Sequence, residues 1–325
     1  MTSRCALFVL LCGVLGCTPA PAPMFDTGGD DAGHVAIDAA SPADGGRDAA
    51  VTLADVGSDA RALDASSADA ALDAGSDAAT PAPEHVVISE IVVAPAAAEY
   101  FEIWNPTSAA VDLTDYYVSD NAVYAGIATA TAWNPPTANP GTDFLIRFPA
   151  GLMIGPNAVL TVALNDTFET TFSRCPDLIA DTTPLACTGG TAPSMLVPTN
   201  GGLDPTKRGT LLSDAREMLV LFRWAAPDTI VHDVDYVTWG SSFDAGQTRA
   251  DKTALPGYLP DTAAASQRAA TAPPSGQSIV RCGGEIGETE TGGNGITGHD
   301  ETSEHLDVSF GVLTTPTPGV RGTCS

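Results

Sequence analysis

Five acidic residues near the C-terminus carry the oxygen atoms that a calcium ion prefers as ligands. They lie in GETETGGNGITGHDETSEHLD, residues 287–307, whose glycines would let a loop fold around an ion. Ca²⁺ takes roughly six to eight oxygen ligands, but this stretch lacks the spacing of an EF-hand loop. We therefore favour a solvated acidic loop and expect no cofactor. The candidate calcium ligands are Glu288, Glu290, Asp300, Glu301 and Glu304.

Four cysteines remain once the three before residue 18 are set aside, namely Cys175, Cys187, Cys282 and Cys324. An even number in an exported chain is typical of disulfides, and four cysteines allow three connectivities. We favour Cys175 with Cys187, which closes one loop, and Cys282 with Cys324, which ties the last strand region to the C-terminus. Zinc is the alternative use of four cysteines, but there is no Cys-x-x-Cys pair.

The common catalytic motifs are missing from the sequence. There is no Gly-x-Ser-x-Gly elbow, no His-Glu-x-x-His helix and no glycine-rich phosphate loop before a helix. His232 and Asp233 stand side by side on an expected strand, where an outward histidine is usually a surface residue. We therefore predict a protein that is not an enzyme and assign no catalytic residue. An envelope hydrolase with acids on its loops is the remaining enzymatic alternative.

Aromatic side chains give a second kind of candidate site. Exposed rings can stack on sugar faces, which would make the chain a glycan-binding or adhesion module. The same residues can equally belong to the core, and only their exposure separates the two interpretations. The candidates are Trp104, Tyr116, Trp133 and Trp239.

The charge of the chain argues against a nucleic-acid partner. The formal net charge is -26 at pH 7, and the two lysines are Lys207 and Lys252. Binding to a phosphate backbone needs clustered lysine and arginine. We expect a protein or glycan partner of unknown identity instead.

The first 16 residues read as a signal peptide. Arg4 precedes a small and apolar run over residues 5–15, which is the length of a secretory segment and too short to span a bilayer. Residues 14–17, VLGC, resemble the bacterial lipobox, which implies cleavage before Cys17 and its lipidation. A plain signal peptide with an incidental cysteine is the alternative. Lipidation would anchor the chain in a membrane through acyl chains.

The residue after the lipobox bears on localisation. Thr18 stands where an aspartate would favour retention in the inner membrane, so resemblance to known sorting rules predicts an outer-membrane lipoprotein, facing the periplasm or the cell surface. The following stretch to residue 84 repeats Asp, Ala, Gly and Ser with Phe25 as its one aromatic residue. Such a chain cannot bury enough apolar surface to offset its backbone entropy. We expect residues 17–84 to form a disordered linker after the signal peptide 1–16.

Residues 85–325 are long enough for one domain with a proper core. Short β-type runs separated by Gly, Pro, Asn and Asp predict about seven strands, which suggests an antiparallel sandwich. Residues 167–174 and 262–269 are candidate short helices. The expected strands are 85–93, 99–105, 110–120, 158–164, 217–224, 229–239 and 277–281.

A series of short motifs runs through residues 85–325. The motifs are ISEI (88–91), EYFEI leading into NP (99–106), VDL (111–113), SD (119–120), FPAGLMIGPNAVLTVALND (148–166), DYVTWG (235–240) and TPTPG (315–319). Their order and spacing resemble the lamin tail domain family. The resemblance implies an immunoglobulin-like all-β sandwich, often exported or lipid-anchored in bacteria. Relative to the family, this chain has long insertions near 122–142, 176–210 and 241–276 and Phe310 where a tryptophan is usual.

Alternation along the strands predicts which side chains form the core. Phe101 and Ile103 share one face of their strand and should point inward. Asp120 and Asp235 more plausibly accept hydrogen bonds from backbone N–H groups than take part in chemistry. The sequence as a whole predicts a lipid-anchored, non-enzymatic module for display or binding at the envelope.

Overall fold

The computed structural model describes residues 82–129, 142–241 and 249–324. Several predicted features lie outside the described residues: the expected signal peptide, the lipidation candidate Cys17, the expected linker up to residue 81, and Trp133. Within those residues, no helix has the length and apolar character needed to cross a bilayer.

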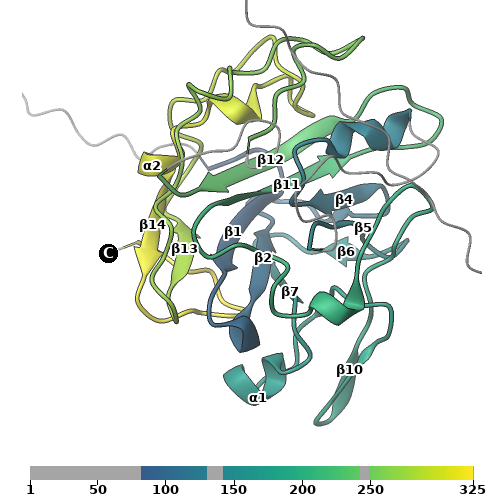
Figure 1. Ribbon diagram of the computed structural model, residues 1–325, viewed down its shortest axis with the longest axis vertical. Helices are drawn as coiled ribbons and strands as arrows, with labels where there is room; N and C mark the ends of the chain where they lie inside the picture. The colour runs from purple at the N-terminus through teal and green to yellow at the C-terminus, as the bar shows by residue number, and fades with distance from the viewer. Residues whose placement is uncertain (1–81, 130–141, 242–248, 325) are drawn as a thin grey trace, which may run out of the picture. The chain divides into compact units, whose positions relative to one another are not determined.

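Two β-sheets form the body of the domain and share one hydrophobic core (Figure 1). All neighbouring strands in them are antiparallel except β7 and β8, which are parallel. In spatial order, the first sheet contains β14 (Phe310–Leu313), β13 (Ser278–Arg281), β1 (Val87–Val92), β2 (Tyr100–Trp104), β7 (Val159–Ala163) and β8 (Leu178–Ile179). The second contains β12 (His232–Trp239), β11 (Glu217–Arg223), β4 (Tyr116–Ser119) and β5 (Leu145–Arg147). The expected immunoglobulin-like sandwich is confirmed.

Shorter elements decorate the two sheets. Two small ribbons pair β3 (Val111–Asp112) with β6 (Met153–Ile154), and β9 (Leu185–Cys187) with β10 (Gly190–Ala192). The helices are α1 (Phe168–Phe172), α2 (Leu306–Ser309), and the 3-10 turns η1 (Ala96–Ala98), η2 (Tyr124–Ala128), η3 (Pro205–Lys207) and η4 (Glu301–Ser303).

Strand pairing follows the alternation of side chains. Phe101 and Ile103 of β2 are fully buried between the two sheets, as predicted. Tyr100 and Glu102 point to the opposite face, yet they are buried as well. Tyr100 packs in a second apolar cluster against Phe168 of α1, with ring centroids 5.6 Å apart. The outer face of this sheet is therefore covered, which a strict alternation of buried and exposed residues does not predict.

The C-terminal segment covers the polar part of that outer face. The Thr317 hydroxyl donates to Glu90 Oε2 over 2.9 Å, and the backbone N–H of Gly319 donates to Glu102 Oε1 over 2.5 Å. Gly319 has a φ of +79°, a backbone conformation that favours glycine. The TPTPG motif thus adds hydrogen bonds to two buried carboxylates that also accept from Ser278 Oγ and Thr161 Oγ1.

All seven predicted strand regions contain a strand, although the region 110–120 divides into β3 and β4. The predicted helix at 167–174 is α1. The candidate helix at 262–269 is wrong, because these residues form turns and isolated bridges. Their alanines do not repeat with a helical period against the core, and Gln267 is held instead by hydrogen bonds from its side-chain amide to the carbonyl oxygens of Ala250 and Thr262.

Two disulfides lie in the described residues. Cys175 is bonded to Cys187 and Cys282 to Cys324, with Cα atoms 5.6 Å and 4.9 Å apart. This is the connectivity favoured from the sequence. The second bond fastens the C-terminal segment beside β13 and β14, and so helps to hold it over the sheet.

Glu99, just before β2, is a buried acid that makes stability depend on pH. Among the described residues its side chain forms no ion pair, and Oε2 accepts from the backbone N–H of Leu211 over 3.3 Å. Burial raises the pKa of Glu99 to about 8. As pH rises from the ordinary glutamate pKa towards this value, the unfolded chain loses the proton while the folded chain keeps it, so folding becomes less favourable.

We expect Glu99→Gln to lessen the loss of stability between pH 5 and pH 8. Each unit by which the pKa is raised corresponds to about 1.4 kcal/mol. Between pH 5 and pH 8, we therefore expect the free energy of unfolding to fall by at least that amount less in Glu99→Gln than in the wild type. Urea unfolding at both pH values measures the effect, with the exposed Glu84→Gln as the matched control. An equal loss in wild type and Glu99→Gln would contradict the assignment.

Candidate functional site

The structure does not bring the five calcium candidates to one point. Asp300 caps η4, where its Oδ1 accepts from the backbone N–H of Thr302. Glu304 forms an ion pair with Arg281, with Oε1 and Nη1 2.7 Å apart. Glu290 is exposed. The two remaining candidates, Glu288 and Glu301, lie in a different group of side chains.

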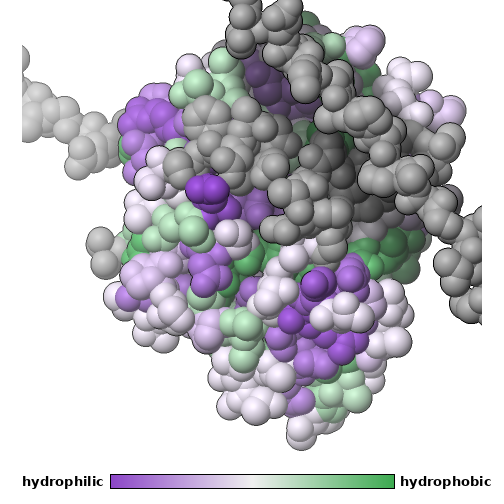
Figure 2. Space-filling model, viewed as in Figure 1, coloured by the Kyte–Doolittle hydropathy of each residue, from purple (hydrophilic) through white to green (hydrophobic). Residues whose placement is uncertain are grey.

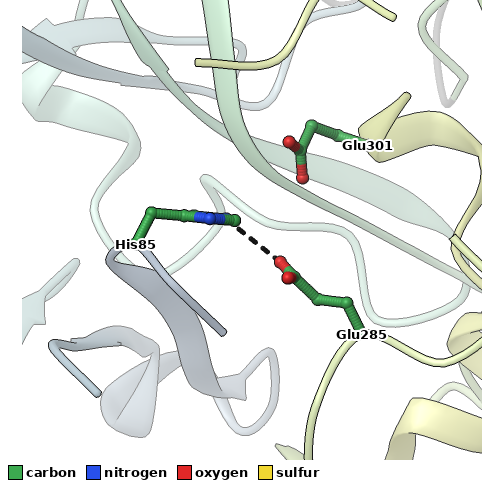
Figure 3. Close-up of side chains that lie close together, drawn as sticks. All are labelled: His85, Glu285 and Glu301. Carbon is green, nitrogen blue, oxygen red and sulfur yellow. Dashed lines mark ion pairs between the residues drawn. The ribbon is translucent and has the colours of Figure 1, made fainter. Parts of the chain in front are cut away.

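This group, which we call the histidine–glutamate cluster, consists of His85, Glu285, Glu288, His299 and Glu301. The ligand atoms of His85, Glu285 and Glu301 all lie within 4.8 Å of one another, and so do those of Glu285, Glu288 and His299. Figure 3 shows the Glu285 carboxylate facing the His85 ring, with the Glu301 carboxylate turned towards both. Glu285 belongs to both triads.

Strand pairing explains how distant residues meet in the cluster. β1 and β13 are antiparallel, so the start of β1 lies beside the end of β13. His85 precedes β1 and Glu285 follows β13, which places the two side chains together. An antiparallel bridge between Thr289 and Asp300 then brings Glu288 alongside His299 and Glu301.

A glycine makes room for the deepest carboxylate. Gly295 lies so close to Glu301 that a Cβ on it would collide with the Glu301 Oε1 atom. The segment that contains Gly295 is pinned to β12, because the backbone N–H of Asp233 donates to Asn294 O and that of Ile296 donates to Asp233 O. A side chain at position 295 would push the carboxylate out of the cluster.

Several polar atoms of the cluster are buried without hydrogen bonds. His85 Nε2 and Glu285 Oε1 lie 3.0 Å apart, but in an orientation that is not that of a hydrogen bond. His85 Nδ1 and one oxygen each of Glu288 and Glu301 are also without partners. In contrast, Glu288 Oε2 lies 3.0 Å from His299 Nδ1, within hydrogen-bonding distance. Buried polar atoms without partners are uncommon in folded proteins and call for an explanation.

The charges in the cluster influence one another. Burial raises the pKa of Glu301 well above its usual range and also raises that of Glu288. Burial alone would lower the pKa of His85, but the neighbouring Glu285 carboxylate outweighs it and the pKa of His85 is raised. The same proximity lowers the pKa of Glu285, although burial opposes the shift. Burial therefore disfavours the charged forms of Glu288 and Glu301, whereas His85 and Glu285 each favour the charged form of the other.

Two other buried groups of charged side chains have all their charges paired, so we assign them a structural role. Lys252 Nζ lies 2.6 Å from Asp233 Oδ2 and 2.8 Å from Asp261 Oδ2, and donates to the Tyr124 hydroxyl oxygen over 3.0 Å. Tyr124 in turn donates to Asp233 Oδ1. This network fastens the segment after residue 249 to β12.

The second group is centred on Arg281, whose Nη2 lies 2.7 Å from Asp235 Oδ1. Its Nη1 pairs with Glu304, and its Nε donates to the backbone oxygen of Ile88. Asp235 also accepts from the backbone N–H of Ile88, and Asp120 accepts from that of Phe144 over 2.7 Å. The capping roles predicted for Asp120 and Asp235 are thus observed.

The aromatic candidates for sugar stacking are mostly core residues. Trp239 is fully buried and donates from Nε1 to Ser213 O, so its proposed role in glycan binding is wrong. Tyr116 is 8% exposed and packs in the hydrophobic core. Trp104 is half-buried, with its ring under the Arg321 guanidinium at 4.4 Å. Every residue of β4 and every residue of β12 except His232 is buried, so Tyr116 and Trp239 are not free to stack on a sugar.

An open groove lies elsewhere on the surface. It has a volume of about 590 Å³ and is lined by residues that include Asp115, Tyr117, Arg147 and Trp224. Trp224 is half-buried, and its ring is tilted against that of Tyr117 with the ring centroids 6.0 Å apart. Among the described residues, Asp115 is the one acid in this lining, so these residues do not supply the pair of facing carboxylates of a glycoside hydrolase. His232, considered above for catalysis, is exposed on β12.

Sequence reasoning missed three members of the cluster. His299 and Glu285 lie in or beside the acidic stretch, so a search for mixed His and Glu ligands there would have found them. His85 lies far from that stretch in the sequence, and only the pairing of β1 with β13 brings it near. No local motif carries that information.

One family model agrees with the fold. The family model of the Lamin Tail Domain matches residues 79–238. A DUF4876 family protein from Bacteroides thetaiotaomicron VPI-5482 is similar in structure, with 12% identity over 74% of this chain and 75% of that chain and a TM-score of 0.41. No curated protein matches. Within the cluster, His85 falls inside the matched range and the other four residues follow it.

We expect Lys252→Met to destabilise the domain strongly. The substitution leaves the buried Asp233 and Asp261 carboxylates without their cation, which typically costs about 3 to 5 kcal/mol. The other lysine, Lys207, is exposed in η3, so Lys207→Met is a matched control expected to change stability by about 0.5 kcal/mol or less. Chemical denaturation at pH 7 compares the two, and equal effects would show that the buried network does not hold the segment.

Proposed function

We propose that this chain is a lipid-anchored, non-enzymatic binding module that displays a lamin-tail-like sandwich at the bacterial outer membrane. The observation that carries the proposal is the pair of disulfides in the folded domain. Structural disulfides persist in oxidising compartments, which agrees with an exported chain. The lipobox-like VLGC at residues 14–17 supplies the attachment point.

The composition between Cys17 and the sandwich suits a spacer. A flexible chain of this length has a root-mean-square span of about 45 Å, and repulsion among its acidic residues extends it further. The described domain begins its first strand at Val87. An anchor, a spacer and a sandwich in this order hold a binding surface at a distance from lipid.

Replacement of the proposed lipid attachment site tests the anchoring directly. We expect Cys17→Ser to release the protein from the membrane fraction, because the variant has no residue to receive acyl chains. Cell fractionation and mass spectrometry of the mature N-terminus measure the change, with Cys12→Ser as the control that leaves acylation intact. Membrane association that survives in Cys17→Ser, or an unmodified mature N-terminus, would contradict the proposal.

The groove beside Trp224 supports a second candidate function, the binding of glycans. It combines aromatic rings with charged and polar groups, as carbohydrate sites do, and its volume falls in the range of small-molecule sites. The exposed Leu196 and Val197 extend its apolar wall. Ligand stacking there would use Trp224 in place of the aromatic residues first considered.

For this candidate we expect Trp224→Ala to weaken glycan binding at least about tenfold, which corresponds to about 1.4 kcal/mol. Array screening followed by titration of the best glycan measures it. Trp104→Ala, at a half-buried tryptophan outside the groove lining, is the matched control. A wild-type protein that binds no glycan, or binding that persists in Trp224→Ala, would rule out this groove.

A further inference from the structure

We propose that the histidine–glutamate cluster is a binding site for one divalent transition-metal ion of the Zn²⁺ class, with His85, Glu285 and Glu301 as its inner ligands. The proposal is independent of the lipid anchor and of the groove. Ligand atoms around such an ion lie about 2.0 to 2.2 Å from it, and so about 3 to 4 Å from one another. The three side chains approach this spacing, since their ligand atoms lie within 4.8 Å of one another.

Burial gives independent support, beyond the clustering of acids. His85 and Glu301 are 5% and 3% exposed, and each directs an atom without a hydrogen bond into the cluster. Glu285 contributes a third such atom, Oε1. Polar atoms without hydrogen bonds in the interior cost free energy. The ion pair between His85 and Glu285 offsets part of this cost, and one shared cation would offset it at all three side chains. Acids that serve only solubility would face water instead.

The donor types select the class of metal. Imidazole nitrogen combined with carboxylate oxygen suits Zn²⁺, Mn²⁺, Fe²⁺ or Co²⁺, whereas Ca²⁺ and Mg²⁺ favour oxygen ligands alone. The cysteines of the described residues are bonded in disulfides and leave no thiolate for the site. Two glutamates and a neutral histidine would balance the charge of a divalent ion.

The second triad supports the first from the solvent side. Glu288 contacts His299, and both adjoin the shared ligand Glu285. The His299 side chain is 24% exposed, whereas those of Glu285 and Glu288 are 8% and 3% exposed. His299 therefore stands at the point where an ion would enter, and the Glu288 carboxyl group lies next to it.

A metal at this position would act as a structural clasp. His85 stands just before β1, where the proposed spacer meets the sandwich, while Glu285 and Glu301 belong to the segment after β13. One ion would join these two parts of the chain without a covalent bond. An ion that binds the folded form alone stabilises it by RT ln(1 + c/Kd), where c is the concentration of free metal, so the melting temperature rises with that concentration.

The test uses the full mature chain, purified in detergent and treated with EDTA before dialysis. Addition of Co²⁺ should produce visible absorption that saturates at one equivalent, and Zn²⁺ should displace it and raise the melting temperature. Ca²⁺ at the same concentration should do neither. X-ray absorption of the wild-type zinc complex needs no variant and should show nitrogen and oxygen ligands at about 2.0 to 2.2 Å, including an imidazole.

Variants then locate the ion. Glu301→Gln and His85→Gln should weaken Co²⁺ binding at least about tenfold and abolish the thermal shift with Zn²⁺. The matched controls, Glu290→Gln and His232→Gln, change exposed residues and should bind as wild type does. No cobalt spectrum, a zinc spectrum without imidazole, a shift with Ca²⁺ alone, or full binding in Glu301→Gln would each overturn the proposal. If His85→Gln does not fold, cobalt binding by Glu301→Gln and the X-ray absorption spectrum of the wild-type zinc complex test the proposal without it.

Discussion

The ion pairs of one buried arginine, Arg281, are the interaction on which this domain most depends. Arg281 belongs to the first sheet, its partner Asp235 to the second, and Glu304 to the segment that carries the candidate site. Arg281 is fully buried and also stacks on Phe310 at 4.5 Å. Because a buried charge without partners is very unfavourable, the two sheets and the segment must come together in one arrangement.

The domain contains two kinds of buried polar group, which differ in whether their polar atoms have partners. The ion pairs of Arg281 and Lys252 have their partners within the chain, and they hold the fold. The histidine–glutamate cluster lies close to the Arg281 network but leaves several atoms without hydrogen bonds. On the face shown in Figure 2, the coloured surface is a mixture of hydrophilic residues and smaller apolar patches.

The sequence predicts the local features of this fold well, but it predicts poorly the contacts between residues that are far apart along the chain. Alternation placed Phe101 and Ile103 in the core because the strand period depends on near neighbours alone. It does not predict that Tyr100 and Glu102, on the other face of the same strand, are buried as well, because α1 and the C-terminal segment cover that face. Short strands such as β5 and β8 carry too few residues to show a period. Glu288 and Glu301 were recognised as candidate ligands, but His85 joins them only through strand register.

A crystal structure of the chain soaked in Zn²⁺, with anomalous scattering recorded at the zinc edge, tests the central claim most directly. The account predicts one strong anomalous peak inside the cluster, about 2.0 to 2.2 Å from a His85 nitrogen and from oxygens of Glu285 and Glu301. A cluster with no peak, or peaks confined to surface histidines such as His232, would contradict it.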